Sequence, residues 1–295
     1  MKKLLSLVLV AFLALSTLPA QKALIVSNGS PLQETELRTR EEALKGGAMP
    51  SREAALQVKA MSRSHEDAAL IDATLKEMGW EVHKYSNLDE ESFKPSISKF
   101  AAALEKDEPA LVFFSGEAIQ IDGNNYLVPQ GKFESEEHIV KVAPELNWLL
   151  SELSAASVRM VFLDAARSPE NLHFKPQEAG LTGIEKVAGN TLLMYSSPLN
   201  TIQPDQDAKN NFLAQALAKE IQVPNLELKT LADKIAVQMG ILHGGKTPPV
   251  PYSVSTIEEG WTLNKVEEGE AESKRIYRSV PVLRKPIDGG VAPSF

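Results

Sequence analysis

The sequence predicts an α/β fold, with a mainly parallel sheet of about six strands between two layers of helices. Strand-like and helix-like segments alternate along most of the chain, an order that builds parallel sheets. The runs 110–115 and 159–165 are largely apolar, as expected of strands buried on both faces. The length of 295 residues, with 43% hydrophobic and 24% charged residues, suits a soluble globular protein of this kind.

The first half of the chain predicts three strands and three helices. Ser51 is placed to cap a first helix, and a second is expected from His65 to Met78, where Gly79 ends it. Residues 28–50 contain several glycines and prolines and predict mainly a loop. The strands are expected at 22–27, 80–85 and 110–115, and the third helix at 93–104.

The next part of the chain begins with a hairpin signal, because Asp122-Gly123 stands between two short apolar runs. After Trp261 the chain is highly charged and lacks apolar periodicity. We therefore expect one domain over 21–260, followed over 261–295 by a charged linker and an extended or disordered tail. Further strands are expected at 159–165 and 190–197, and helices at 146–153, 211–221 and 226–239, the last ending at Gly240.

Residues 1–20 have the composition of a secretory signal peptide. Lys2 and Lys3 precede an apolar core, 4–15, that is shorter than the about 20 residues needed to span a bilayer. Cleavage is expected after Ala20, and a retained membrane anchor is the alternative. Because no cysteine stands there to carry a lipid, we expect a secreted or periplasmic protein.

Charge and cysteine content exclude several classes of function. The net charge of −8, without any run of basic residues, argues against a nucleic-acid partner. The sequence contains no cysteine, so disulfides, thiolate nucleophiles and cysteine-ligated metals are excluded. The five histidines show no metal-ligand spacing.

Two expected strand ends carry polar residues, at the edge where α/β sheets place their sites. The first is Ser115-Gly116-Glu117, and the second is Asp164-Ala165-Ala166-Arg167. Together with their neighbours, these motifs resemble the caspase-like peptidase family (C14), in its bacterial metacaspase or orthocaspase branch. The resemblance covers about 22–256 and includes the opening strand 22–29, Glu66-Asp67-Ala68, the strand start 79–82, the hairpin 119–129 and the segments 210–221 and 244–252.

The resemblance implies a three-layer α/β/α sandwich whose activity needs a cysteine nucleophile and a histidine that manages its proton. Glu117 stands at the position of the family's histidine, and Ala166 at that of its cysteine. The glycine that follows the histidine is replaced by Ala118. A methyl group cannot attack a carbonyl, and no other cysteine exists, so we expect no catalytic residue and a pseudopeptidase.

The resemblance also implies an acidic pocket for Arg or Lys side chains, with Asp67 and Asp164 in its acidic positions and Ser115 beside them. Structural alternatives remain open for each residue. Asp67 would stabilise the first turn of a helix, Asp164 would bind loop amides, and Glu117 would pair with Arg167. A Ca²⁺ ion held by the three carboxylates is a weaker alternative; otherwise no cofactor or metal is expected.

The sequence therefore predicts an exported caspase-fold module that binds or regulates a protein or peptide, with an acidic cleft that accepts basic side chains. One alternative is an active caspase-type peptidase, or another hydrolase, that uses a non-standard site around Glu117. Another is a regulatory partner that pairs, through its sheet edge, with itself or with an active relative. No membrane partner is expected after signal cleavage.

Overall fold

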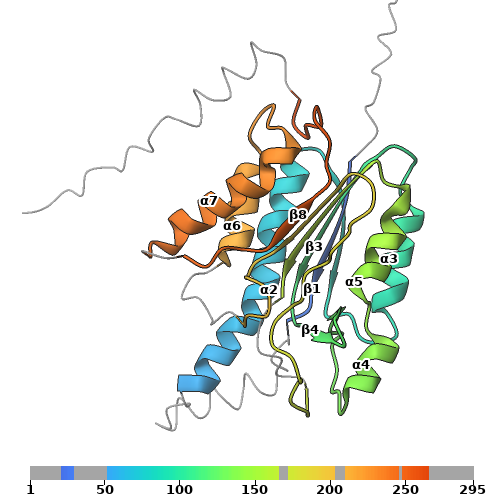
Figure 1. The fold of residues 1–295 in the computed structure, drawn as a ribbon, viewed down its shortest axis with the longest axis vertical. Helices are drawn as coiled ribbons and strands as arrows, with labels where there is room; N and C mark the ends of the chain where they lie inside the picture. The colour runs from blue at the N-terminus through green and yellow to red at the C-terminus, as the bar shows by residue number, and fades with distance from the viewer. Residues whose placement is uncertain (1–20, 30–51, 166–171, 203–209, 246–247, 266–295) are drawn as a thin grey trace, which may run out of the picture.

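A six-stranded sheet, with strands in the order β2-β1-β3-β6-β7-β8, forms the centre of the molecule (Figure 1). The computed structural model describes residues 21–29, 52–165, 172–202, 210–245 and 248–265. Five strands run parallel and only β8 is antiparallel, so the predicted mainly parallel sheet is confirmed. The strands are β1 (Lys22–Ser27), β2 (Glu81–Ser86), β3 (Pro109–Ser115), β6 (Val158–Asp164), β7 (Thr191–Tyr195) and β8 (Ser253–Ser255).

Successive side chains of each central strand enter the two opposite layers of the core. In β3, Phe113 joins the core beneath one helix layer, whereas its neighbour Phe114 joins the core beneath the other. β1 divides in the same way between Ile25 and Val26. Because alternate residues of a strand point to opposite faces, burial of both faces makes the whole run apolar, as the sequence showed.

Helices cover both faces of the sheet, which gives the expected three-layer sandwich. One layer contains α2 (Arg52–Glu77), α6 (Phe212–Glu220) and α7 (Leu231–His243), and the other contains α3 (Phe93–Ala102) and α5 (Leu146–Glu152) (Figure 1). Short 3-10 turns, Leu153–Ala155 and Leu228–Thr230, follow α5 and precede α7. Among the described residues, no helix is both long and apolar enough to cross a membrane.

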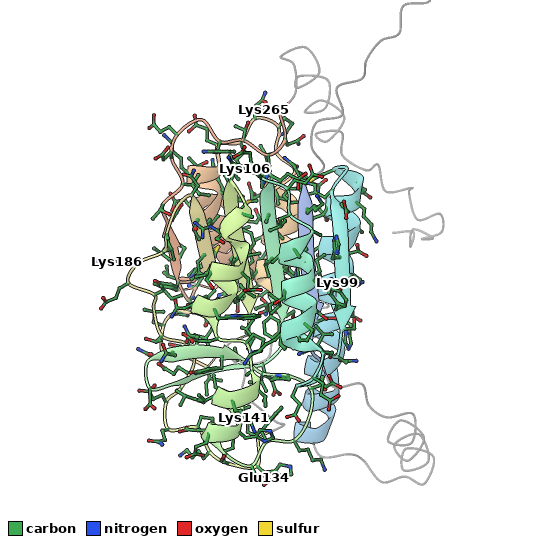
Figure 2. All side chains as sticks on the ribbon, turned by 90° about the vertical axis from the view of Figure 1, so that its right-hand side faces the viewer. Lys99, Lys106, Glu134, Lys141, Lys186 and Lys265 are labelled. Carbon is green, nitrogen blue, oxygen red and sulfur yellow. The ribbon has the colours of Figure 1, made fainter. Side chains whose placement is uncertain are left out.

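A small hairpin and one helix lie beyond the carboxyl ends of the parallel strands (Figure 1). The hairpin joins β4 (Ala118–Ile121) to β5 (Asn124–Leu127), and α4 (Glu136–Val142) packs on it through Ile139. Asp122 and Gly123 have φ values of +49° and +74°, which the predicted Asp-Gly turn requires. In Figure 2, Glu134 and Lys141 mark this end of the molecule, and Lys106 and Lys265 mark the opposite end.

Several helix boundaries differ from the prediction, including the start of α7, which lies at Leu231 and not at residue 226. A single helix, α2, runs through residues 52–77, where we expected two helices with a new start near His65. The last helix passes through Gly240 and ends at His243, followed by Gly244 in the left-handed conformation with φ +64°. The short elements α4 and β8 were not predicted, and most of the expected tail, from 266 onward, lies outside the described residues.

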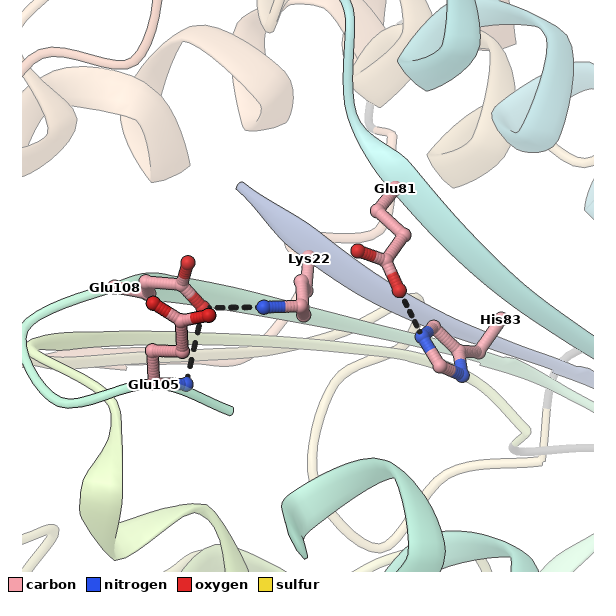
Figure 3. A network of polar contacts seen from close by, with 5 residues as sticks. All are labelled: Lys22, Glu81, His83, Glu105 and Glu108. Atoms are coloured by element: carbon pink, nitrogen blue, oxygen red, sulfur yellow. Dashed lines mark hydrogen bonds and ion pairs between the residues drawn. The ribbon is translucent and has the colours of Figure 1, made fainter. Parts of the chain in front are cut away.

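A buried ion pair closes the amino end of the sheet. Lys22, at the start of β1, donates to Glu108 over 2.7 Å, and the two side chains are only 8% and 2% exposed. Glu108 also accepts a hydrogen bond from the backbone N–H of Glu105, and nearby Glu81 contacts His83 (Figure 3). This network lies at the edge opposite to the strand ends that carry the candidate site.

Candidate functional site at the carboxyl ends of the strands

The last residues of three adjacent strands stand side by side. In the parallel register, Ser27 of β1 pairs with Ser115 of β3, and Ser115 pairs with Asp164 of β6. Ser27 and Ser115 are fully buried, and Asp164 is 1% exposed. The hydroxyl of Ser115 donates to Asp164 Oδ2 over 3.3 Å, so two predicted site residues are in contact.

The turn after β3 delivers Glu117 from this row of strand ends. Gly116 fits there because a Cβ atom would lie 2.7 Å from the ring of Phe114 and 3.0 Å from the carbonyl oxygen of Asn28. The backbone carbonyl of Glu117 accepts a hydrogen bond from the N–H of Val128 over 2.9 Å, which ties the turn to the residue that follows β5. The Glu117 side chain is half-buried.

The two positions that the resemblance matches to the family's histidine and cysteine follow β3 and β6, which pair with each other. The N–H of Gly116 donates to the carbonyl of Asp164 over 3.2 Å, and the N–H of Ala118 donates to the carbonyl of Ala165 over 3.1 Å. Residues that flank Glu117 are thus bonded to the residues that lead toward position 166. Ala166 itself, and Arg167 with it, lie outside the described residues.

Asp67 reaches the same region from the helix layer. It is fully buried in the middle of α2, so the alternative that it stabilises a first helical turn is wrong. Its Oδ1 accepts hydrogen bonds from the side chain of Asn210 over 3.0 Å and from the backbone N–H of Asn211 over 2.9 Å.

One asparagine joins the two predicted pocket acids. The side-chain amide of Asn211 donates to Asp164 Oδ1 over 2.7 Å, while its backbone N–H donates to Asp67. Asn211 is also the N-cap of α6, since its side-chain oxygen accepts from the N–H of Leu213. The start of α6 therefore connects the carboxylates of α2 and β6. Asp164 accepts from the side-chain amide of a residue outside the strand, as the structural alternative for Asp164 expected.

The family model of the caspase domain, Peptidase C14, matches residues 56–259. The chain belongs to the caspase-domain family. Its fold is similar to the crystal structure of caspase-1 from Spodoptera frugiperda, with a TM-score of 0.54 and 14% sequence identity, over 84% of this chain and 92% of that chain. No significant similarity links the sequence to a curated protein.

Ser115 is fully buried and its hydroxyl hydrogen is directed to a carboxylate, not to a histidine. His65 instead lies 2.8 Å, through Nδ1, from Ser27 and 3.1 Å, through Nε2, from the carbonyl oxygen of Gly29. Burial lowers the pKa of His65, partly offset by the Gly29 hydrogen bond, and the charge of Lys84 lowers it further.

Several residues of this region were missed by sequence reasoning. Ser27, Asn28, His65 and Asn211 all form buried or half-buried hydrogen bonds at the strand ends. Asn28 has the clearest signal, because a polar residue directly after a buried strand is typical of a strand-end site. The described residues contain no group of three or more His, Asp or Glu side chains that could hold a metal ion.

Proposed function

We propose that this protein is an exported caspase-domain module that binds a basic protein or peptide segment without cleaving it. The observation that carries the proposal is that a member of the caspase family contains no cysteine anywhere in its sequence. A glutamate also occupies the position of the family's histidine. Neither the attacking thiolate nor its usual proton acceptor is therefore available.

The charge of the strand ends supports a basic partner. Asp67 and Asp164 both accept hydrogen bonds from Asn211, and the half-buried Glu117 follows β3, the strand that pairs with β6. Carboxylates in a partly dry site bind guanidinium or ammonium groups through charge-assisted hydrogen bonds. Because Asn210 and Asn211 already donate to the two aspartates, a basic side chain would exchange with these amides or approach from Glu117.

The chemical part of the proposal is tested with fluorogenic Arg and Lys peptides. We expect no hydrolysis above the buffer rate by the unmodified protein. Hydrolysis by the protein that disappears in Glu117→Gln would establish the alternative of a non-standard hydrolase and overturn the proposal. The double variant Glu117→His with Ala166→Cys restores both family groups, and its rate would show how far the scaffold still supports the reaction.

The binding part is tested by fluorescence polarisation with matched peptides that contain either arginine or its neutral isostere citrulline. We expect tighter binding of arginine, and a loss of that preference in Glu117→Gln. The exposed substitution Glu259→Gln serves as the charge-matched control. Equal affinity for the two peptides would contradict recognition of a basic side chain.

Export and self-association complete the proposal. Export rests on the composition of residues 1–20 and is tested by sequencing the amino terminus of the protein recovered from the periplasm or medium, which we expect to begin at Gln21. The edge strand β8 offers a place for pairing with a second copy or a relative. Light scattering of the purified protein distinguishes a monomer from a dimer.

A further inference from the structure

A hollow of about 680 Å³ lies directly beside the candidate site. Its volume falls within the range of roughly 300–1,000 Å³ that is common for ligand sites. The hollow begins at Ala118, the residue after Glu117. Its apolar lining also includes Ile119, Leu172, Phe174 and Ile202.

One buried side chain fixes two walls of the hollow. Gln120 of β4 is 5% exposed, and its amide donates to the carbonyl of Ala179 over 2.8 Å and to Asn200 Oδ1 over 2.9 Å. Segments separated by 59 and 80 residues from Gln120 are thereby joined to the hairpin. Gly180, with φ +66°, packs so closely on the backbone of Thr201 that a Cβ atom would overlap it.

The wall formed by residues 172–180 is also anchored at the end far from Ala179. The N–H of His173 donates to the carbonyl of Phe133 over 2.8 Å. Farther along, the backbone and side chain of Gln177 donate to the two carboxylate oxygens of Glu136 over 3.1 and 3.0 Å. The described segment 172–180 is thus held in place along its length, so the hollow is formed without a ligand.

We propose that this hollow receives a bulky apolar side chain of the same peptide whose basic side chain binds at the strand ends. The inference rests on the proposed function and names its peptide class: a basic residue with a large aliphatic or aromatic residue close to it. Continuity supports this occupant, because Ala118 lines the hollow and its N–H is bonded to Ala165 at the end of β6. Ile202, 42% exposed, offers apolar surface that such a side chain would remove from water.

The experiment measures affinities for peptides that contain arginine flanked, on one side and then on the other, by Phe, Leu or Ser. We expect Phe or Leu on one side to bind about 10- to 100-fold more tightly than Ser, as burial of one large apolar side chain allows. Ile202→Glu should remove this preference while leaving the Ser peptide almost unchanged. The control variant Val237→Glu changes an exposed apolar residue of α7 that does not line the hollow, so it should keep the preference for Phe or Leu.

Equal affinity for the Phe, Leu and Ser peptides would overturn the inference, as would equal behaviour of the two glutamate variants. The proposed function fails differently, when arginine and citrulline peptides with the same flanks bind alike. A citrulline-Phe peptide that still binds and is still sensitive to Ile202→Glu would preserve the hollow as an apolar site while rejecting the basic partner. Thermal melting of each variant confirms that the fold is retained.

Discussion

Replacing Glu108 by glutamine tests how strongly the buried ion pair at the amino end of the sheet supports the fold. The side-chain amide keeps the volume and an acceptor oxygen for the Glu105 N–H, but it leaves Lys22 without its counter-charge. The two side chains are 8% and 2% exposed, so water screens the remaining ammonium group poorly. Removal of one partner from such a pair costs about 3–5 kcal/mol.

For a domain of this size each kcal/mol lowers Tm by about 2–4 °C, so Glu108→Gln should melt about 6–20 °C below the parent. Differential scanning calorimetry at neutral pH measures the shift. The double variant Lys22→Met with Glu108→Leu, which removes both charges, should recover most of the stability. The exposed pair Lys229–Glu259 has a similar distance, 2.6 Å, and Glu259→Gln should cause no measurable change.

A melting temperature of Glu108→Gln within 2 °C of the parent, or a double variant as unstable as the single one, would refute this reasoning. The pH dependence gives a second check. Burial by itself lowers the pKa of Lys22, but the hydrogen bond and charge of Glu108, with Glu81 and Glu105, raise it above 10.5 overall. The contribution of the charged lysine is therefore fully present from neutral pH up to about 10.5, and it is lost as the pH rises through the higher pKa of the folded state.

Three further variants probe other parts of the fold. Because the pKa of His65 is lowered in the folded protein, the free energy of unfolding should fall as the pH drops below 6.5. Melting curves recorded at several pH values should show a weaker pH dependence for His65→Gln. The control variant His243→Gln should keep the pH dependence of the parent. Gly180→Ala should lower the free energy of unfolding, measured in urea, by about 2–3 kcal/mol, because the left-handed backbone and the contact with Thr201 both oppose a side chain. An unchanged urea midpoint would contradict that contact. Asn211→Ala should lower the free energy of unfolding by about 2–3 kcal/mol, because α6 loses its cap and the buried Asp164 loses a hydrogen-bond donor. A decrease of less than about 0.5 kcal/mol would show that water replaces the amide.

The central strands were predictable because burial on both faces leaves a continuous apolar run. The helix boundary near His65 was not, because Arg63 and Ser64 are polar residues that are nonetheless 2% and 1% exposed. Buried polar residues break the apolar periodicity from which a helix is recognised. The seven-residue α4, with one buried side chain, is too short to show a period at all.

The candidate site was predictable only where its residues follow strands in sequence. Ser115, Glu117 and Asp164 stand at strand ends, so topology alone brings them to one edge. Asn211 is 47 residues from Asp164 and 144 from Asp67, and its role depends on how α6 packs against the sheet. No local pattern indicates such a contact, although an asparagine before an apolar helix does predict a cap.

The bridge made by Asn211 has a mechanical consequence. The same residue caps the first turn of α6 and donates one hydrogen bond each to Asp67 of α2 and Asp164 of β6. A ligand that displaces Asn211 from either aspartate would break a hydrogen bond that holds the start of α6. The side chains of Leu213 and Leu217 in this helix are fully buried in the core. We therefore expect binding of the proposed peptide at the strand ends to change the amide-exchange rates of α6.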